Sequence, residues 1–169
     1  MKQPKINEAT RNLLFSADTE KVLSAIQTLK ETGNKAYLPL LFDLLVTHPE
    51  TEVKKAILDL LATVKDKEAI PVIIEALQNQ KYRSIRKELT TSCWQSGLDY
   101  SAYFEVFIDL IIHEEWEVAF EAFTVIENLE HFPPEGQFRE IKLKIAGALR
   151  NVNEQKQYFL EEILKMSSE

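Results

Sequence analysis

Residues 51–79 read TEVKKAILDLLATVKDKEAIPVIIEALQN, and this stretch contains two amphipathic segments of similar length back to back. In the first segment, apolar residues recur at the i, i+3, i+4, i+7 spacing that puts them on one face of a helix. Those residues are Val53, Ala56, Ile57, Leu60, Leu61 and Val64. The second segment repeats the pattern with Ile70, Ile73, Ile74 and Leu77. Because only the polar residues KDKE separate the segments, the stretch predicts an antiparallel helix pair with a short connection.

The same pattern recurs on both sides of this helix pair. Its first apolar position falls at four residues that stand 31, 32 and 33 positions apart, namely Val22, Val53, Ile85 and Val118. A sustained period of this length is typical of a solenoid, in which each unit buries its apolar face only against its neighbours. The sequence therefore predicts a helical repeat protein.

The residues of this stretch also resemble a HEAT repeat of the short bacterial kind. Val53-Lys54 matches the start of the first helix, Asp66 the turn, and Ala69-Ile70-Pro71 the opening of the second helix. The resemblance extends upstream over 20–46 and continues in register over 84–129, where Ser92 and Ser96 stand at positions that aliphatic residues usually occupy. It implies an all-α fold, a right-handed α-solenoid of about five antiparallel helix pairs, as in the armadillo/HEAT superfamily.

We expect a single domain over residues 1–169, since this length is sufficient for one continuous core. The expected helices are near 5–16, 19–32, 35–47, 51–64, 67–79, 83–96, 100–113, 116–130, 134–150 and 154–166. Asp18 and Thr51 are the expected N-caps of two of them. Gly33 is the expected residue after the end of the second helix.

The charge of the chain disfavours non-specific binding to nucleic acid, which needs clustered Lys and Arg. The formal net charge is −7, and no Lys or Arg occurs between Lys87 and Arg139. Eleven Asp and Glu residues fall inside that interval. Two interpretations remain open: these carboxylates belong to solvated helix faces, or they form a docking surface for a basic partner.

The sequence contains no grouping of side chains that indicates catalysis. The three His residues are far apart, the four Gly residues form no phosphate-binding loop, and Cys93 is the sole cysteine. Cys93 is predicted to be a buried, inert thiol. We therefore expect a non-enzymatic protein without metal or cofactor. With no apolar leader at the N-terminus and no apolar run of membrane-spanning length, we also expect a cytoplasmic protein without a membrane partner.

The HEAT resemblance implies that the second helix of each pair lines a concave binding face. The residues predicted to contact a partner there are Lys55, Leu58, Arg86, Lys87, Trp94, Phe120, Phe123 and Glu127. Lys54, Lys55, Arg83, Arg86 and Lys87 would form a basic patch beside the two phenylalanines. An alternative remains open, in which a C-terminal helix or a shifted register covers Phe120 and Phe123.

The predicted function is that of a scaffold or adaptor that binds a protein or peptide on this face. A first alternative is a DNA-binding protein similar to the alkylpurine DNA glycosylases, with Arg86, Lys87, Trp94 and Asp59 as the contacting residues. A second alternative is a HEAT-like lyase subunit resembling the phycobilin lyases. The acidic composition makes nucleic acid the less favoured partner.

Overall fold

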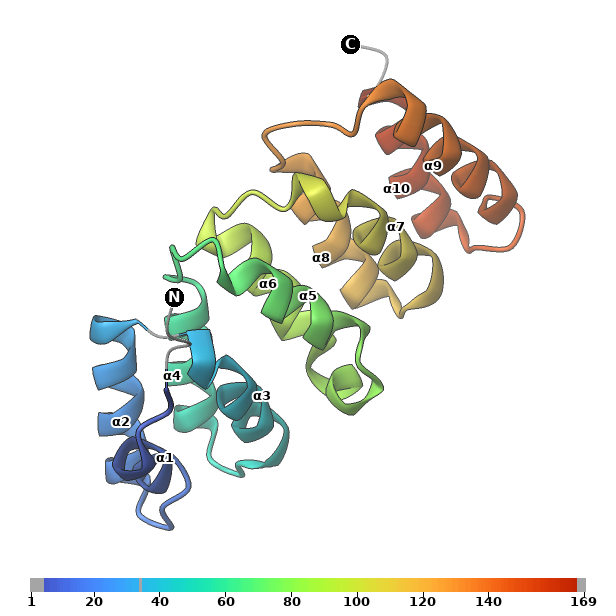
Figure 1. Cartoon of the computed structure of the whole chain (residues 1–169). Helices are drawn as coiled ribbons and strands as arrows, with labels where there is room; N and C mark the ends of the chain where they lie inside the picture. Colours follow the sequence, from blue (N-terminus) through green and yellow to red (C-terminus); the bar gives the residue numbers. More distant parts are fainter. Residues whose placement is uncertain (1–4, 34, 167–169) are drawn as a thin grey trace. The chain divides into compact units, whose positions relative to one another are not determined.

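The structure is a computed structural model that describes residues 5–33 and 35–166 (Figure 1). The described residues form ten α-helices and three short 3₁₀ helices, and no strand occurs among them. The predicted all-α class is therefore confirmed. The helices group into two compact units, an N-terminal unit of residues 1–98 and a C-terminal unit of residues 99–169. Each unit is described by itself, and the grouping of all helices into a single domain stays a prediction.

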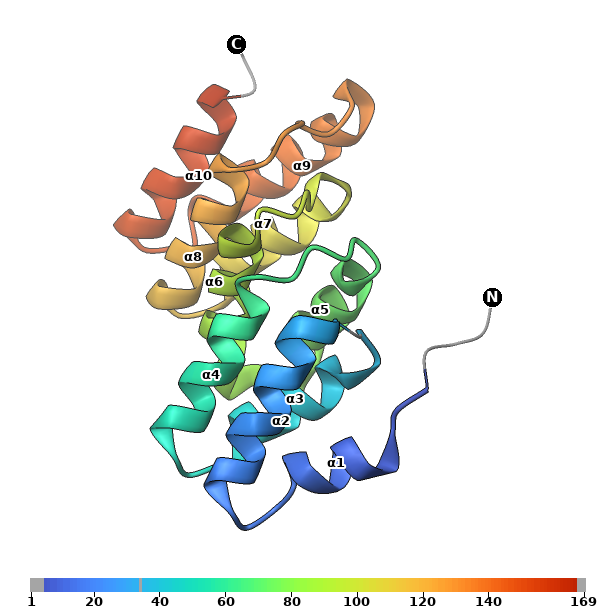
Figure 2. The same ribbon diagram turned by 90° about the vertical axis from the view of Figure 1, so that its left-hand side faces the viewer.

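The N-terminal unit contains six α-helices arranged as three successive pairs. They are α1 (Glu8–Leu14), α2 (Thr19–Thr32), α3 (Leu38–Thr47), α4 (Thr51–Leu61), α5 (Ala69–Gln78) and α6 (Arg86–Ser96), with 3₁₀ helices η1 (Lys35–Tyr37) and η2 (Gln80–Ile85) before α3 and α6. Helix α2 packs against α4, and α4 against α6, whereas α3 packs against α5. Figure 2 shows α2 beside α4. The even-numbered helices thus form one layer and the odd-numbered helices the other.

Both helices predicted over 51–79 are present, as α4 and α5, but they do not form the predicted antiparallel pair: α4 packs on α2, α3 and α6, and α5 packs on α3 and α6. The apolar register residues Val53, Ile57 and Leu61 are completely buried, as the periodicity predicts. Helix α4 ends at Leu61, three residues before the predicted end, because the chain turns with Thr63 N–H donating to Leu60 O at 3.0 Å. Helix α5 begins at Ala69 rather than at residue 67.

The predicted helix ends are correct at two positions and wrong at several others. The Asp18 side chain caps α2 by accepting from Glu20 N–H, and Gly33 follows α2 with a φ of 58°. Thr51 is not a cap, because α4 already includes it and Glu50 precedes the helix. The helices predicted to start at 5, 83 and 100 begin at Glu8, Arg86 and Phe104, the last two directly after a 3₁₀ helix.

Helix α6 buries an unusually polar face. Ser92 and Ser96, which replace the aliphatic residues of the HEAT pattern, are both buried. Their hydroxyls donate to carbonyl oxygens of the same helix, Ser92 to Leu89 O at 2.7 Å and Ser96 to Cys93 O at 3.1 Å. Burial of these hydroxyls is tolerated because each has a hydrogen-bond partner within the helix.

The C-terminal unit contains the remaining four α-helices. They are α7 (Phe104–His113), α8 (Trp116–Glu127), α9 (Glu135–Ala148) and α10 (Glu154–Met166), with the 3₁₀ helix η3 (Ser101–Tyr103) before α7. Helices α7 and α8 form an antiparallel pair, α9 packs on α7, and α10 packs on both α7 and α8. Figures 1 and 2 show α8 and α10 side by side. This contact between α8 and α10 builds the surface described next.

Candidate functional site

Four of the residues predicted to contact a partner lie in the N-terminal unit at accessible positions. Lys55 and Lys87 are exposed, and Leu58 and Trp94 are half-buried. All four belong to α4 or α6, in the layer of even-numbered helices. Their participation in partner binding stays a prediction.

The remaining predicted contact in this unit, Arg86, is buried. The prediction that it binds a partner is therefore wrong. Only 3% of Arg86 is exposed, and its Nε donates to the Leu77 carbonyl oxygen at 2.8 Å. Leu77 lies in the last turn of α5, so the guanidinium satisfies a carbonyl at a helix C-terminus, where a positive charge is favourable. Arg86 is therefore removed from the predicted basic patch and from the residues predicted to contact DNA in the alternative function.

Helix α8 carries the predicted aromatic positions in the C-terminal unit. Phe120 is 43% exposed, whereas Phe123 is only 7% exposed. The Phe123 ring stacks on Phe159 of α10, with centroids 4.9 Å apart and planes 18° apart. The expectation that Phe123 faces outward is therefore wrong, because the last helix covers it. The alternative interpretation, that a C-terminal helix covers both phenylalanines, is correct for Phe123 and only partly correct for Phe120.

A group of neighbouring rings remains accessible where α8 and α10 meet. We call Trp116, Phe120, Tyr158 and Phe159 the α8–α10 aromatic cluster. Trp116 and Phe120 stack at 5.5 Å with planes 20° apart, and Phe159 lies 6.1 Å from Phe120 and 6.2 Å from Tyr158. Trp116 and Tyr158 are 41% and 58% exposed. The four rings, with Glu154 and Gln155, line an open hollow of about 420 Å³.

Sequence reasoning identified only Phe120 and missed the other three members of this cluster, of which Phe159 lies on the helix that covers α8. Trp116 lies four residues before Phe120, on the same face of α8, so the helical spacing could have identified it. Tyr158 could not be identified in this way, because only the packing of α10 on α8 brings it to Phe120.

Two carboxylates lie further along the same contact between helices. Glu127 occupies the last position of α8, and its pKa is raised by burial and by the negative charge of Glu162 on α10. Glu162 pairs with Lys165 at 2.6 Å. Within the described part of the chain, Glu127 forms no ion pair. We call the aromatic cluster together with Glu127 and Glu162 the α8–α10 surface. Its Glu127 end carries a carboxylate that has no cationic partner among the described residues.

The surroundings of this surface are strongly acidic. Residues 99–169 contain 15 Asp and Glu against 6 Lys and Arg, a formal net charge of −9. Both lysines of α10 are engaged, since Lys165 pairs with Glu162 and Lys156 donates to the carbonyl oxygen of Ile112 at 3.3 Å. The C-terminal unit thus presents an aromatic surface in a negative electrostatic field.

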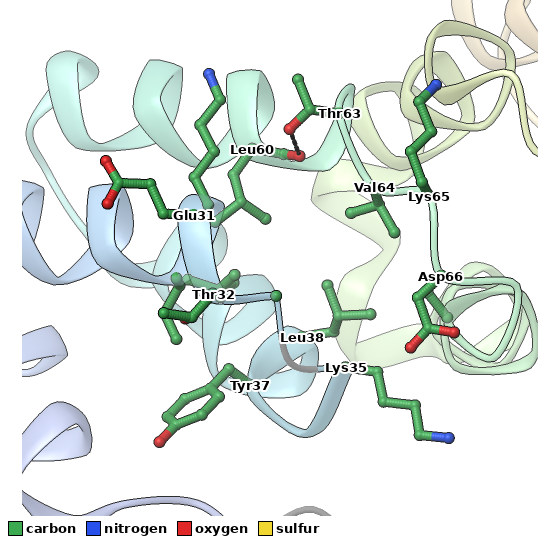
Figure 3. A pocket seen from close by; sticks show the side chains of 15 residues that line it. Glu31, Thr32, Lys35, Tyr37, Leu38, Leu60, Thr63, Val64, Lys65 and Asp66 are labelled. Carbon is green, nitrogen blue, oxygen red and sulfur yellow. Dashed lines mark hydrogen bonds between the residues drawn. The ribbon is translucent and has the colours of Figure 1, made fainter.

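The N-terminal unit contains a separate pocket of about 290 Å³ at the ends of α2 and α4 (Figure 3). Leu38, Leu60 and Val64 contribute apolar wall, while both acidic and basic side chains stand at the rim. Two of the rim lysines are already paired, Lys35 with Glu68 and Lys65 with the Ser96 carbonyl oxygen. The pocket therefore offers no net charge preference and is a weaker candidate than the α8–α10 surface.

Among residues 5–33 and 35–166, no three His, Cys, Asp or Glu residues converge on a position that could hold a metal ion. Cys93 is completely buried, as predicted, with its Sγ 3.3 Å from Leu89 O. No helix in the described part of the chain has the length and apolarity that crossing a membrane requires.

Paired helices packed in two layers, as in the N-terminal unit, define an α-helical repeat protein. The family model for HEAT repeats matches residues 7–94, which is more than half of the chain. The chain therefore belongs to the HEAT-repeat family. HEAT repeats generally mediate protein–protein interactions, and their fold is typically a non-enzymatic scaffold. The search of curated proteins found no matching relative.

Proposed function

We propose that this protein is a non-enzymatic interaction module, a scaffold or adaptor that binds a protein or peptide partner. Within each unit taken separately, the proposed contacts lie on the even-numbered helices, which are α2, α4 and α6 in the N-terminal unit and α8 and α10 in the C-terminal unit. Of these, α2, α4, α6 and α8 are the helices that the HEAT resemblance assigns to the concave face, and α10 packs beside α8. Membership of a family whose repeats mediate protein–protein contacts supports this class of function.

The α8–α10 aromatic cluster is the observation that carries the proposal. Single exposed apolar residues are ordinary on a protein surface, and Leu143 on α9 is one example. Trp116, Phe120 and Tyr158 differ because they are neighbours, and each is more than 40% exposed around one hollow. Contiguous apolar surface of this kind marks contact sites, and Trp and Tyr are enriched among the residues that dominate binding energy.

The even-numbered helices of the N-terminal unit carry a separate, more polar region of proposed contacts. Lys55, Leu58, Lys87 and Trp94 remain the proposed contacts there, since all four are at least partly accessible. Charge reversal tests this region. Lys55→Glu combined with Lys87→Glu replaces two positive charges with negative ones and removes no buried atoms. We expect slower association with an acidic partner region and little change in stability.

A pull-down from lysate of the source cells tests the proposal. The bait is the full chain, compared with a Trp116→Ala/Phe120→Ala variant and with a Leu143→Ala control. Leu143 is 65% exposed and lies on α9, outside the proposed face. Equal helicity and equal melting temperature must first be established for all three. A partner retained by wild type and the control but lost by the double variant supports the proposal. A partner retained equally by all three overturns it.

A further inference from the structure

We propose that the α8–α10 surface binds a cationic amphipathic helix of a partner protein, in which a large apolar side chain and a Lys or Arg stand two helical turns apart. This inference rests on the proposed function and adds the chemistry and spacing of the bound segment. It uses two neighbouring features of one surface, the aromatic hollow at one end and the Glu127 and Glu162 carboxylates at the other.

The hollow selects an apolar side chain. Phe159, which is 7% exposed, is the most buried of its lining rings, and the partly exposed rings of Trp116, Phe120 and Tyr158 complete the lining. Its volume of about 420 Å³ accommodates the side chain of a leucine, phenylalanine or tryptophan. Glu154 and Gln155 are the two lining residues that are not aromatic. An apolar anchor that fills the hollow removes the exposed aromatic surface from water.

The charge around the hollow selects a cation. Glu117 on α8 and Glu154 and Glu161 on α10 are exposed, and the two lysines of α10 are occupied by Glu162 and by backbone carbonyls. Glu127 has no cationic partner among the described residues, and Glu162 disfavours its ionised form. A Lys or Arg bound beside Glu127 and Glu162 reduces this repulsion, whereas an acidic residue there increases it.

The spacing between the two features selects a helix of defined register. Phe120 and Glu127 lie seven residues apart on one face of α8, which corresponds to about 10.5 Å along the helix axis. A partner helix lying alongside α8 presents residues i and i+7 on one face at this same distance. The apolar anchor and the cation therefore reach their subsites together from positions seven residues apart.

Fluorescence anisotropy with synthetic helices tests this inference on the full chain. The probe is a labelled Ala-based peptide of about 18 residues, long enough to form a helix, with Leu and Arg seven residues apart. Three matched peptides replace Arg with Glu, replace Leu with Ala, or shorten the spacing to five residues. We expect the Leu/Arg peptide to bind at least about tenfold more tightly than each of the three.

Protein variants then assign the binding to this surface. In the Glu127→Gln/Glu162→Gln variant, we expect the affinity for the Leu/Arg peptide to fall several-fold. The ratio of its affinity to that of the Glu-containing peptide should also decrease. Trp116→Ala/Phe120→Ala is expected to abolish binding. A Glu140→Gln/Leu143→Ala variant, altered at exposed positions of α9, serves as the matched control and should bind like wild type.

Three results would overturn the inference: equal affinity for the Arg and Glu peptides, no binding of any peptide, or full binding by Glu127→Gln/Glu162→Gln. The lysate experiment separates this failure from that of the proposed function. A natural partner that depends on Trp116 and Phe120, together with any of these three results, leaves the interaction module standing and removes only the cationic helix. Any of these three results together with a natural partner that all three baits retain equally removes both proposals.

Discussion

The ring of Phe123 on α8 stacks against the ring of Phe159 on α10, with centroids 4.9 Å apart. This contact has two consequences for the C-terminal unit. It buries a phenylalanine that the helical register places on the outer side of α8, and it aligns α8 and α10 so that Trp116, Phe120 and Tyr158 become neighbours. The stability of the unit and the shape of its candidate binding surface therefore depend on the same pair of rings.

Truncation of Phe159 tests this dependence. Phe159 is buried and contacts three other rings, so Phe159→Ala leaves a cavity between α8 and α10. We expect the free energy of unfolding to fall by about 3–5 kcal/mol, as for other buried Phe→Ala changes. Chemical denaturation followed by circular dichroism measures the change. Tyr158→Ala, at a residue that is 58% exposed, is the control and should cost less than about 1 kcal/mol. Equal losses for the two variants would contradict the assigned packing.

Arg86 provides a second test, because its structural role replaces the binding role expected from the sequence. Arg86→Met keeps the aliphatic stem but removes the donor to the Leu77 carbonyl oxygen. We expect a loss of about 1.5–3 kcal/mol in the free energy of unfolding, the range for hydrogen bonds to charged groups. Thermal and urea denaturation measure it. Lys87→Met, at the adjacent exposed position, should change stability by no more than about 0.5 kcal/mol. An Arg86→Met variant as stable as wild type would show that this hydrogen bond contributes little to stability.

The raised pKa of Glu127 predicts that the stability of the folded protein decreases as pH rises. Glu127 is exposed as a residue, yet burial of its carboxyl group and the nearby Glu162 raise its pKa above the usual 4.5. Between these two pKa values the folded state holds more protons than the unfolded state, so the free energy of unfolding decreases as pH rises through this window. Lys165, which pairs with Glu162, moderates the effect.

Glu127→Gln removes this titration. We therefore expect the variant to be more stable than wild type at neutral pH, with the difference vanishing at about pH 3, below both pKa values. Urea denaturation at a series of pH values gives the comparison, and Glu140→Gln on α9 is the control. A difference between Glu127→Gln and wild type that grows toward low pH would show that the sign is wrong.

Lys144 links α9 to α7 through two ion pairs. Its Nζ lies 2.7 Å from both Glu105 and Asp109, which are four residues apart on α7. Burial lowers the pKa of Lys144, but the hydrogen bonds to Asp109 and Glu105 outweigh this effect and raise the pKa on balance.

Lys144→Met leaves the two carboxylates of α7 to repel each other. We expect a loss of about 0.5–1 kcal/mol in stability, since the pairs are partly exposed, and a smaller loss at high salt. Melting temperatures at low and high ionic strength measure both effects. Arg150→Met, which changes an exposed cation near the end of α9, should alter stability by less. A loss that does not depend on salt would indicate packing of the lysine stem rather than charge.

The periodicity of apolar residues was sufficient to predict most of the helices and the helical-repeat architecture, whereas the HEAT-repeat class was predicted from the resemblance of residues 51–79 to that family. Residues such as Val53, Ile57 and Leu61 are buried where the i, i+3, i+4, i+7 pattern requires, because that pattern depends only on the geometry of a single helix. Local chemistry was similarly sufficient at Asp18 and Gly33, whose roles involve neighbours within one helical turn. Helix starts that follow 3₁₀ turns, as at Arg86 and Phe104, were not predicted, because the apolar spacing continues through both helix types.

The candidate surface shows what only the tertiary structure decided. Arg86, Phe120 and Phe123 all occupy helix positions outside the regular apolar stripe, and by sequence they are equivalent candidates for the surface. Arg86 is buried with its Nε donating to the Leu77 carbonyl oxygen at the end of α5. Helix α10 covers Phe123 but leaves Phe120 partly exposed. Burial of such residues is decided by groups distant in sequence, since the free energy of removing a ring or a charge from water depends on what packs against it.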